Sequence, residues 1–263
     1  MKRILSTLAA LAVVASSAVP ALADKLQDIR DAGVVRIGVS LGGEPIGFRD
    51  EQNNPVGYDV DVATRLAEKL GVPVEFTDVS GDARISMLVS GQLDIVVANT
   101  SATLERAKSV DFTIPYNRAG LRVIVQADSG IQSLEDLAGK SVVVGRGTTG
   151  EAFIKEAVPD AELVYVDQFA PDGVLQLQQG RVDAAIEDSS LLDYLATQNP
   201  SLVTLPGLYS NDPISIAVAK GDPEFVRWLD MFVSDYIQSG AYEANYKKWW
   251  GETANPPELN PLW

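Results

Sequence analysis

The sequence contains no cysteine and no histidine, and these two absences exclude much of the usual enzyme chemistry. Without cysteine there is no disulfide, no thiolate metal site and no cysteine nucleophile. Without histidine there is no imidazole metal ligand, no Ser-His-Asp triad and no side chain that ordinarily titrates near neutral pH. Most hydrolase mechanisms are thereby removed, and we expect the protein to use no metal and no cofactor.

Positive charge is also scarce, with 21 Lys and Arg against 36 Asp and Glu. Lys2 and Arg3 precede an apolar run over 4–19, and Ala21-Leu22-Ala23 follows it. This pattern is typical of an export signal cleaved after Ala23, and the run is too short for a retained membrane span. Cleavage would leave 19 cations and 36 acids, a formal charge of −17. We therefore expect a periplasmic protein that avoids nucleic acid and anionic membrane surfaces.

Strand-like and helix-like segments alternate along the remaining chain, which is typical of α/β architecture with mostly parallel strands. The expected strands are 34–39, 74–76, 93–97, 122–125, 141–144, 163–166, 184–186 and 214–219. The expected helices include 58–70, 84–90 and 223–250, the last broken near Gly240. The 240 residues after position 23 are enough for two lobes of ordinary size.

A weak internal repeat supports this division into two lobes. Segment 91–101 reads GQLDIVVANTS and resembles segment 180–190, which reads GRVDAAIEDSS. Asn99 and Asp188 come just past the strand of each copy, where open α/β sheets bind their ligands. Neighbouring side chains on a strand diverge, so only one of Glu187 and Asp188 can face a cleft. The match to Asn99 favours Asp188.

The stretch 98–106, which reads ANTSATLER, follows the first of these strands and is expected to lead into a helix. Small polar residues, a helix N-terminus and the bidentate guanidinium of Arg106 would together hold a carboxylate. The alternative is that Thr103 only caps the helix and that Arg106 is a solvated cation. With Asp188 in the other lobe, the stretch would complement both charged ends of an α-amino acid.

Residues 145–150 read GRGTTG and match a dinucleotide-binding pattern, with Asp167 at the distance of the ribose-binding acid. The position at the start of a second lobe, the export signal and the missing acid–base partner all weigh against a nucleotide. The same loop suits a smaller anion. Thr148 and Glu151 match a capping box, and Thr149 is the alternative cap. Hydroxyl groups there could reach a ligand carboxylate.

Two other pairs of residues are interpreted as structural. Asp59 and Asp61 resemble a paired-carboxylate site, but acids in a first helical turn stabilise the helix N-terminus. Trp249 and Trp250 are more consistent with packing of the tail than with a stacking platform.

Several motifs together resemble the periplasmic solute-binding proteins for polar amino acids, which serve ABC importers. These motifs are GYDVDV at 57–62, DFTIPY at 111–116, LAGK at 137–140, GTT at 147–149 and KKWWG at 247–251. The resemblance implies a monomer of the Venus-flytrap type, in which two crossover strands form a hinge and the ligand is clamped between two α/β lobes before delivery to a permease. The lobes would comprise 24–121 with 215–263, and 122–214, with crossovers near 119–125 and 211–216.

The resemblance also implies roles for individual residues. Arg106 would grip the ligand α-carboxylate with Ser101 and Thr149 as helper donors, Asn99 would be a further partner, and Asp188 would accept from the α-ammonium. The complete candidate site is Arg84, Asn99, Ser101, Arg106, Arg146, Thr148, Thr149 and Asp188. The chain departs from the family pattern at Gly43, where many members place an aromatic residue against the ligand.

An acidic amino acid is the expected ligand. Arg84 resembles an arginine that glutamate/aspartate-binding members use for the side-chain carboxylate, and Arg146 would add a second cation. The alternative for Arg84 is a salt bridge to a neighbour such as Asp82, and Ser40 stands where the family has another cation.

Other functions are known on the same scaffold. A periplasmic dehydratase of cyclic dicarboxylic acids would use Glu187 or Glu44 as its acid, and a signalling sensor would dock on a receptor.

Overall fold

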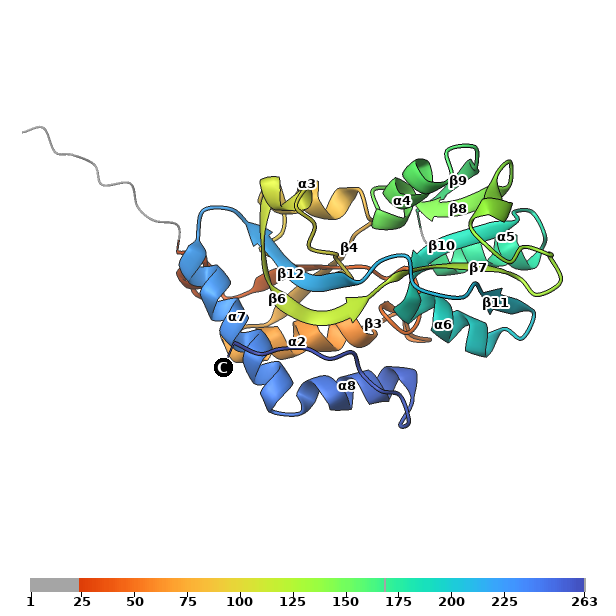
Figure 1. The fold of residues 1–263 in the computed structure, drawn as a ribbon. Coiled ribbons are helices and arrows are strands. Elements are labelled where there is room, and N and C mark those ends of the chain that lie inside the picture. Colours follow the sequence, from red (N-terminus) through yellow and green to blue (C-terminus); the bar gives the residue numbers. More distant parts are fainter. Residues whose placement is uncertain (1–23, 168, 263) are drawn as a thin grey trace, which may run out of the picture.

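The structure is a computed structural model that describes residues 24–167 and 169–262, so the expected export signal lies outside the described residues. Two five-stranded sheets form two lobes, which lie at the left and right of Figure 1. The first sheet has the order β4 (Val74–Asp78), β1 (Val35–Val39), β5 (Ile95–Val96), β12 (Asp212–Ala219) and β6 (Val110–Ala119). The second has the order β11 (Leu202–Thr204), β7 (Leu121–Gln126), β10 (Ala184–Asp188), β8 (Ser141–Gly145) and β9 (Glu162–Val166).

The two-lobed α/β class is as predicted, but the strands are not mostly parallel. In the first sheet β1 runs parallel to β4 and β5, whereas β12 runs antiparallel to β5 and β6. In the second sheet β8 runs parallel to β9 and β10, whereas β7 runs antiparallel to β10 and β11. Half of the pairings are therefore antiparallel, because β6 leads towards the second lobe and β12 returns beside it in the opposite direction.

The internal repeat maps onto equivalent places in the two lobes. Its strands are β5 and β10, and each is the third of five strands in its sheet. The chain passes from β6 to β7 through Gly120 alone. A Cβ atom at Gly120 would lie 2.2 Å from the carbonyl oxygen of Ser210, in the returning segment. Glycine therefore lets the two connections between the lobes pass close together.

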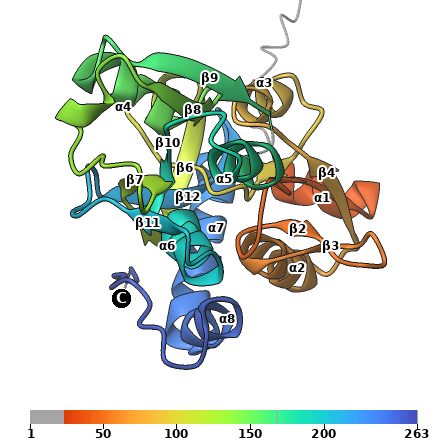
Figure 2. The same cartoon turned by 90° about the vertical axis from the view of Figure 1, so that its right-hand side faces the viewer.

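Helices cover both sheets (Figures 1 and 2). Those of the first lobe are α1 (Lys25–Ala32), α2 (Tyr58–Leu70), α3 (Ala83–Val89), α7 (Pro223–Gln238) and α8 (Ala241–Trp250). Those of the second are α4 (Thr149–Ala157), α5 (Leu175–Gln178) and α6 (Ser189–Gln198). Short turns of other helix types are η1 (Arg106–Lys108), η2 (Glu135–Leu137) and η3 (Phe169–Val174), and β2 (Phe48–Arg49) pairs with β3 (Pro55–Val56). No helix in the described ranges is long and apolar enough to cross a membrane.

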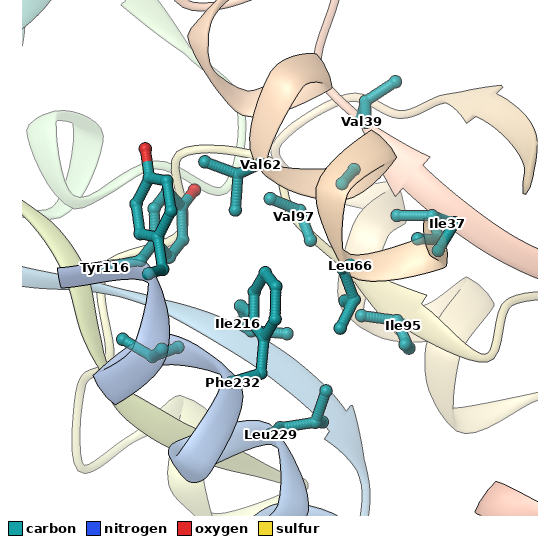
Figure 3. Close-up of a cluster of buried hydrophobic side chains, with 14 of the residues drawn as sticks. Ile37, Val39, Val62, Leu66, Ile95, Val97, Tyr116, Ile216, Leu229 and Phe232 are labelled. Carbon is teal, nitrogen blue, oxygen red and sulfur yellow. The ribbon is translucent and has the colours of Figure 1, made fainter. Parts of the chain in front are cut away.

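The core of the first lobe lies between its sheet and helices α2 and α7. Figure 3 shows Leu66 of α2 and Phe232 of α7 pointing towards Ile95 and Ile216 of the sheet. All four are buried, and full burial of such a side chain contributes about 1.5–3 kcal/mol. This packing fixes the strands whose carboxyl ends carry the cleft residues.

Candidate ligand-binding cleft

A cavity of about 70 Å³ lies between the two lobes, enough space for several water molecules. In the first lobe its wall is built at the carboxyl ends of β1, β4 and β5, where Ser40, Ser80 and Asn99 follow the strands. In the second lobe Gly145 and Val166 end β8 and β9 and also lie on the wall. The ends of parallel strands from both sheets therefore face one another, as expected for a ligand site of α/β sheets.

The lobes are in a closed arrangement, with hydrogen bonds between them. Asn99 Nδ2 donates to Asp188 Oδ2 at 2.7 Å, and Arg106 Nη2 donates to the Gly147 carbonyl oxygen at 2.9 Å. The backbone N–H of Ala170 donates to the Gly42 carbonyl oxygen at 2.9 Å. Residues from both members of the repeat thus meet across the cleft.

Gly43 has no room for an aromatic side chain in this closed arrangement. A Cβ atom there would lie 2.4 Å from the Cβ of Ala170, far inside van der Waals contact. The aromatic ring on the cavity wall belongs instead to Phe169, which begins η3 in the second lobe. The departure from the family pattern at Gly43 therefore coincides with an aromatic side chain supplied from the opposite side.

Four of the eight candidate residues line the cavity, namely Arg84, Asn99, Arg146 and Thr148. The other four, which are Ser101, Arg106, Thr149 and Asp188, are not on its wall, although Arg106 and Asp188 take part in the contacts between the lobes. Ser101 is buried and forms an isolated bridge with Ile214 of β12.

Arg84 is buried and is held by the backbone of the neighbouring strand end. Its Nη1 donates to the Ala98 carbonyl oxygen at 2.5 Å and lies 3.4 Å from that of Asn99. Asp82 accepts from Ser80 Oγ at 2.5 Å, and Arg84 is in none of the salt bridges of the described residues, so the alternative of an Arg84–Asp82 pair is wrong. Arg84 Nε is buried without a hydrogen-bond partner among the described residues. Burial lowers the pKa of Arg84, against the opposing effect of nearby Glu187.

The expected helix after the first repeat is a single 3₁₀ turn, η1, which begins at Arg106. The preceding residues are tied to β12 instead, because Ala102 N–H donates to the Pro213 carbonyl oxygen at 2.9 Å. Thr103 Oγ1 accepts from Arg106 N–H at 3.2 Å, so its capping role extends over one turn only. The anion site therefore lacks the expected helix N-terminus and depends on the guanidinium of Arg106.

The Arg106 side chain is largely withdrawn from solvent between the lobes. Its Nη1 donates to the Ser101 carbonyl oxygen at 2.8 Å, in addition to the bond from Nη2 to Gly147. Burial and the neighbouring charge of Arg84 together lower the pKa of Arg106 to about 10. The guanidinium is still a cation at neutral pH. It has five N–H donors and uses two of them for carbonyl oxygens, so N–H donors remain for a ligand carboxylate.

At the start of α4 the cap is Thr148 and not Thr149. Thr148 Oγ1 accepts from Glu151 N–H at 3.2 Å, while Glu151 Oε2 accepts from Gly147 N–H at 2.7 Å, one residue earlier than in a standard capping box. A Cβ atom at Gly147 would lie 2.8 Å from the Cα of Asp82. The loop is thus covered by the first lobe, which leaves no space for a pyrophosphate in this arrangement.

Glu187, and not only Asp188, faces the space between the lobes. Glu187 lies on the cavity wall, whereas Asp188 is buried beside it and accepts from Asn99. Both residues lie within β10, and the one on the cavity wall is Glu187, whereas the sequence pattern favoured Asp188. Burial raises the pKa of both carboxyl groups above their usual range, and for Glu187 the charge of Asp188 adds to the effect.

Asp59 and Asp61 lie outside the cavity wall, in line with the structural interpretation. Asp61 accepts from the indole N–H of Trp249 at 2.8 Å, and Trp250 stacks on Tyr246 with ring centres 4.3 Å apart. Burial raises the pKa of Asp59 to about 7.

Some wall residues were missed or had been given another role. Ser80 and Asp167 come just after β4 and β9. Asn99 was predicted because polar residues at the carboxyl end of a strand line the ligand site, and the same rule would have predicted these two residues. Phe169 lies in a π-helical turn, and no local pattern in the sequence marks it.

Comparisons with known proteins identify the relatives of this chain. The family model described as bacterial extracellular solute-binding proteins, family 3, matches residues 35–252. The glutamine-binding protein GlnH of Bacillus subtilis is 29% identical over 86% of this chain and 84% of its own. The L-glutamate/L-aspartate-binding protein of Pseudomonas aeruginosa is 28% identical over 98% and 92%. The cyclohexadienyl dehydratase of the same organism is 27% identical over 94% of each chain.

Solved structures show the same architecture. A solute receptor for L-cysteine from Neisseria gonorrhoeae superposes with a TM-score of 0.83 at 31% identity, covering 88% of this chain and 97% of the receptor. A mutant of ArgBP from T. maritima gives a TM-score of 0.81 at 33% identity, covering 86% and 98%.

Proposed function

Because the chain belongs to the bacterial extracellular solute-binding proteins of family 3, we propose that it captures one amino acid between its lobes and delivers it to an ABC transporter permease. On this proposal it is a monomer without catalytic activity, exported to the periplasm after cleavage behind Ala23. Hinge motion about the two connections between the lobes would admit and release the ligand.

One observation carries the proposal: opposite charges meet in the cleft from opposite lobes. Arg106 of the first lobe suits an α-carboxylate, and Asp188 of the second suits an α-ammonium. A zwitterion therefore complements the site. Micromolar affinity requires only about −8.2 kcal/mol, which two or three charge-assisted contacts in a dry cleft would supply.

An acidic side chain is the finer part of the proposal. Arg84 and Arg146 both lie on the cavity wall, and the described part of the chain offers no acceptor to the buried Arg84 Nε. A buried donor of a charged group that lacks its hydrogen bond is costly, and a ligand carboxylate would satisfy it. Of the three carboxyl groups on the wall, Asp82 is already bonded to Ser80, the pKa of Glu187 is raised by burial so that its neutral form is favoured, and Asp167 follows β9 in the second lobe.

Titration calorimetry with the purified mature protein against the twenty standard amino acids tests both amino-acid capture and the preference for an acidic side chain. We expect heat of binding for glutamate and aspartate, and weaker binding of glutamine and asparagine, which differ only in the terminal charge. Tighter binding of the amides would refute the acidic ligand and leave amino-acid capture intact. No heat with any amino acid would refute amino-acid capture.

A dehydratase is the second candidate, and Glu187 is the observation that favours it. A buried carboxyl group on the cavity wall with a raised pKa is a positioned acid, as such a reaction needs. Fold alone does not separate an enzyme from a binding protein. Incubation with prephenate and with arogenate discriminates: we expect neither to be consumed, and conversion of either would establish the enzyme.

A further inference from the structure

Asn99 has a backbone conformation that residues other than glycine rarely adopt. Its φ angle is 45°, in the left-handed region, and it lies on the cavity wall just beyond β5. Asparagine is among the residues with a Cβ atom that adopt it most readily, so the cost is at most the roughly 1–2 kcal/mol of an ordinary residue. Contacts around Asn99 fix this conformation, as is common where a side chain has to be aimed.

The contact that holds Asn99 comes from the interior of the first lobe. Asp59 Oδ2 accepts from the Asn99 backbone N–H at 2.6 Å, and Asp59 Oδ1 accepts from the Tyr116 hydroxyl at 2.8 Å. Asp59 is 1% exposed and Tyr116 is fully buried, and neither lies on the cavity wall. A buried carboxylate is expensive, and a helix N-terminus alone is a weak reason to keep one here.

On its other side Asn99 reaches the second lobe. Its Nδ2 donates to Asp188 Oδ2 at 2.7 Å, which uses one oxygen of that carboxylate. Asp188 Oδ1 and Asn99 Oδ1 are both buried and have no hydrogen-bond partner among the described residues. These two oxygens belong to side chains that are hydrogen-bonded to each other. Because an ammonium group has three N–H donors, one such group could donate to both oxygens.

We infer that Asp59, supported by Tyr116, is a positioning residue for ligand binding that acts through Asn99 and never touches the ligand. Its carboxylate fixes the left-handed backbone of Asn99, and the amide then orients Asp188 across the cleft. This inference rests on the proposed function, because it takes the ammonium group of an amino acid as the ligand of Asp188. It gives the first acidic residue of the GYDVDV motif a role beyond its helix.

A double-mutant cycle tests the inference with L-glutamate as the probe, or with L-glutamine if glutamate gives no heat. The variants are Asp59→Ala, Asn99→Gly and the double variant, each measured by titration calorimetry. Glycine adopts a positive φ without a supporting contact, and it has no side-chain amide that must be oriented. In the Asn99→Gly background, Asp59 therefore has neither a backbone conformation nor an amide to position. We expect Asp59→Ala to weaken binding about tenfold or more in the native background, and less than about twofold in the Asn99→Gly background.

Urea unfolding of the same four proteins separates this coupling from a purely structural effect, because lost packing should destabilise both backgrounds equally. Equal losses of affinity in the two backgrounds would overturn the inference. If Asp59→Ala does not fold, Tyr116→Phe replaces it in the cycle, with a smaller loss expected in the native background only. If neither glutamate nor glutamine binds, the cycle uses the standard amino acid that binds most tightly. Failure of the unmodified protein to bind any of the twenty would instead refute the proposed function, and the inference with it.

Discussion

The stability of the ligand-free protein should fall as the pH rises from 5 to 8. The pKa of Asp59 is raised from its ordinary value near 4 to about 7, chiefly by burial. Between these two values the folded protein holds a proton that the unfolded chain has released. The free energy of unfolding therefore decreases with rising pH, by about 1.4 kcal/mol per pH unit for each such proton. The contribution of Asp59 levels off above pH 7, where its carboxyl group is ionised in both states.

The raised pKa of Asp59 lowers the free energy of unfolding by about 4 kcal/mol between pH 4 and pH 8, because each pKa unit corresponds to about 1.36 kcal/mol. Glu187 and Asp188 act in the same direction, because burial raises their pKa as well. Carboxylates such as Asp94, whose pKa is lowered by hydrogen bonds and charge from Arg36, oppose this trend only below about pH 4. The maximum of stability is therefore expected near pH 5.

Urea unfolding followed by circular dichroism at pH 5, 6, 7 and 8 measures this slope. The matched variant is Asp59→Asn, a neutral isostere that keeps an acceptor for Asn99. We expect it to be more stable than the native protein at pH 8 and to have a shallower pH dependence. A native stability that is flat or rises from pH 5 to 7 would refute the assignment of a proton to this buried group.

Three further predictions concern the cleft. Arg106→Ala should cost about 3–5 kcal/mol of binding free energy, because it leaves a buried ligand carboxylate unpaired; calorimetry that finds unchanged affinity would contradict its role. Ligand binding should release protons and tighten between pH 5.5 and 8, because a bound ammonium favours the ionised form of Asp188, whose pKa is raised by burial; calorimetry in two buffers with different ionisation heats measures this release. Gly43→Ala should hold the lobes apart, because its Cβ would lie 2.4 Å from that of Ala170, so that X-ray scattering finds a larger radius of gyration with ligand present. Adding Ala170→Gly to that variant should restore closure, and a variant that closes normally without it would contradict the steric argument.

The strand-end residues were predictable because their signal is local. A short apolar run followed by polar residues marks the carboxyl end of a buried strand, and this rule identified Asn99 directly. The Arg146 and Thr148 positions followed from a glycine-rich turn after a strand, and both line the cavity. The division into two lobes likewise followed from a repeat whose copies are the middle strands of the two sheets.

The remaining features depend on contacts between distant residues. The helix expected at Arg106 is reduced to one turn because the residues before it pair with β12, more than 100 positions later. Strand direction was misjudged for the same reason, since the order of strands is set by the return of β12. Glu187 was not selected because the repeat aligns Asp188 with Asn99, and an alignment of strands does not show which side chain lies on the cavity wall.

Trp250 gives the protein a built-in optical reporter. Its indole N–H donates to the Ser190 carbonyl oxygen at 2.8 Å, so α8 of the first lobe is bonded to α6 of the second, which lies above it in Figure 2. Movement of one lobe against the other would change the surroundings of this ring, and tryptophan emission depends on those surroundings. The sequence has four tryptophans, so single replacements would assign the signal. Ligand capture could then be followed in real time on the unlabelled protein.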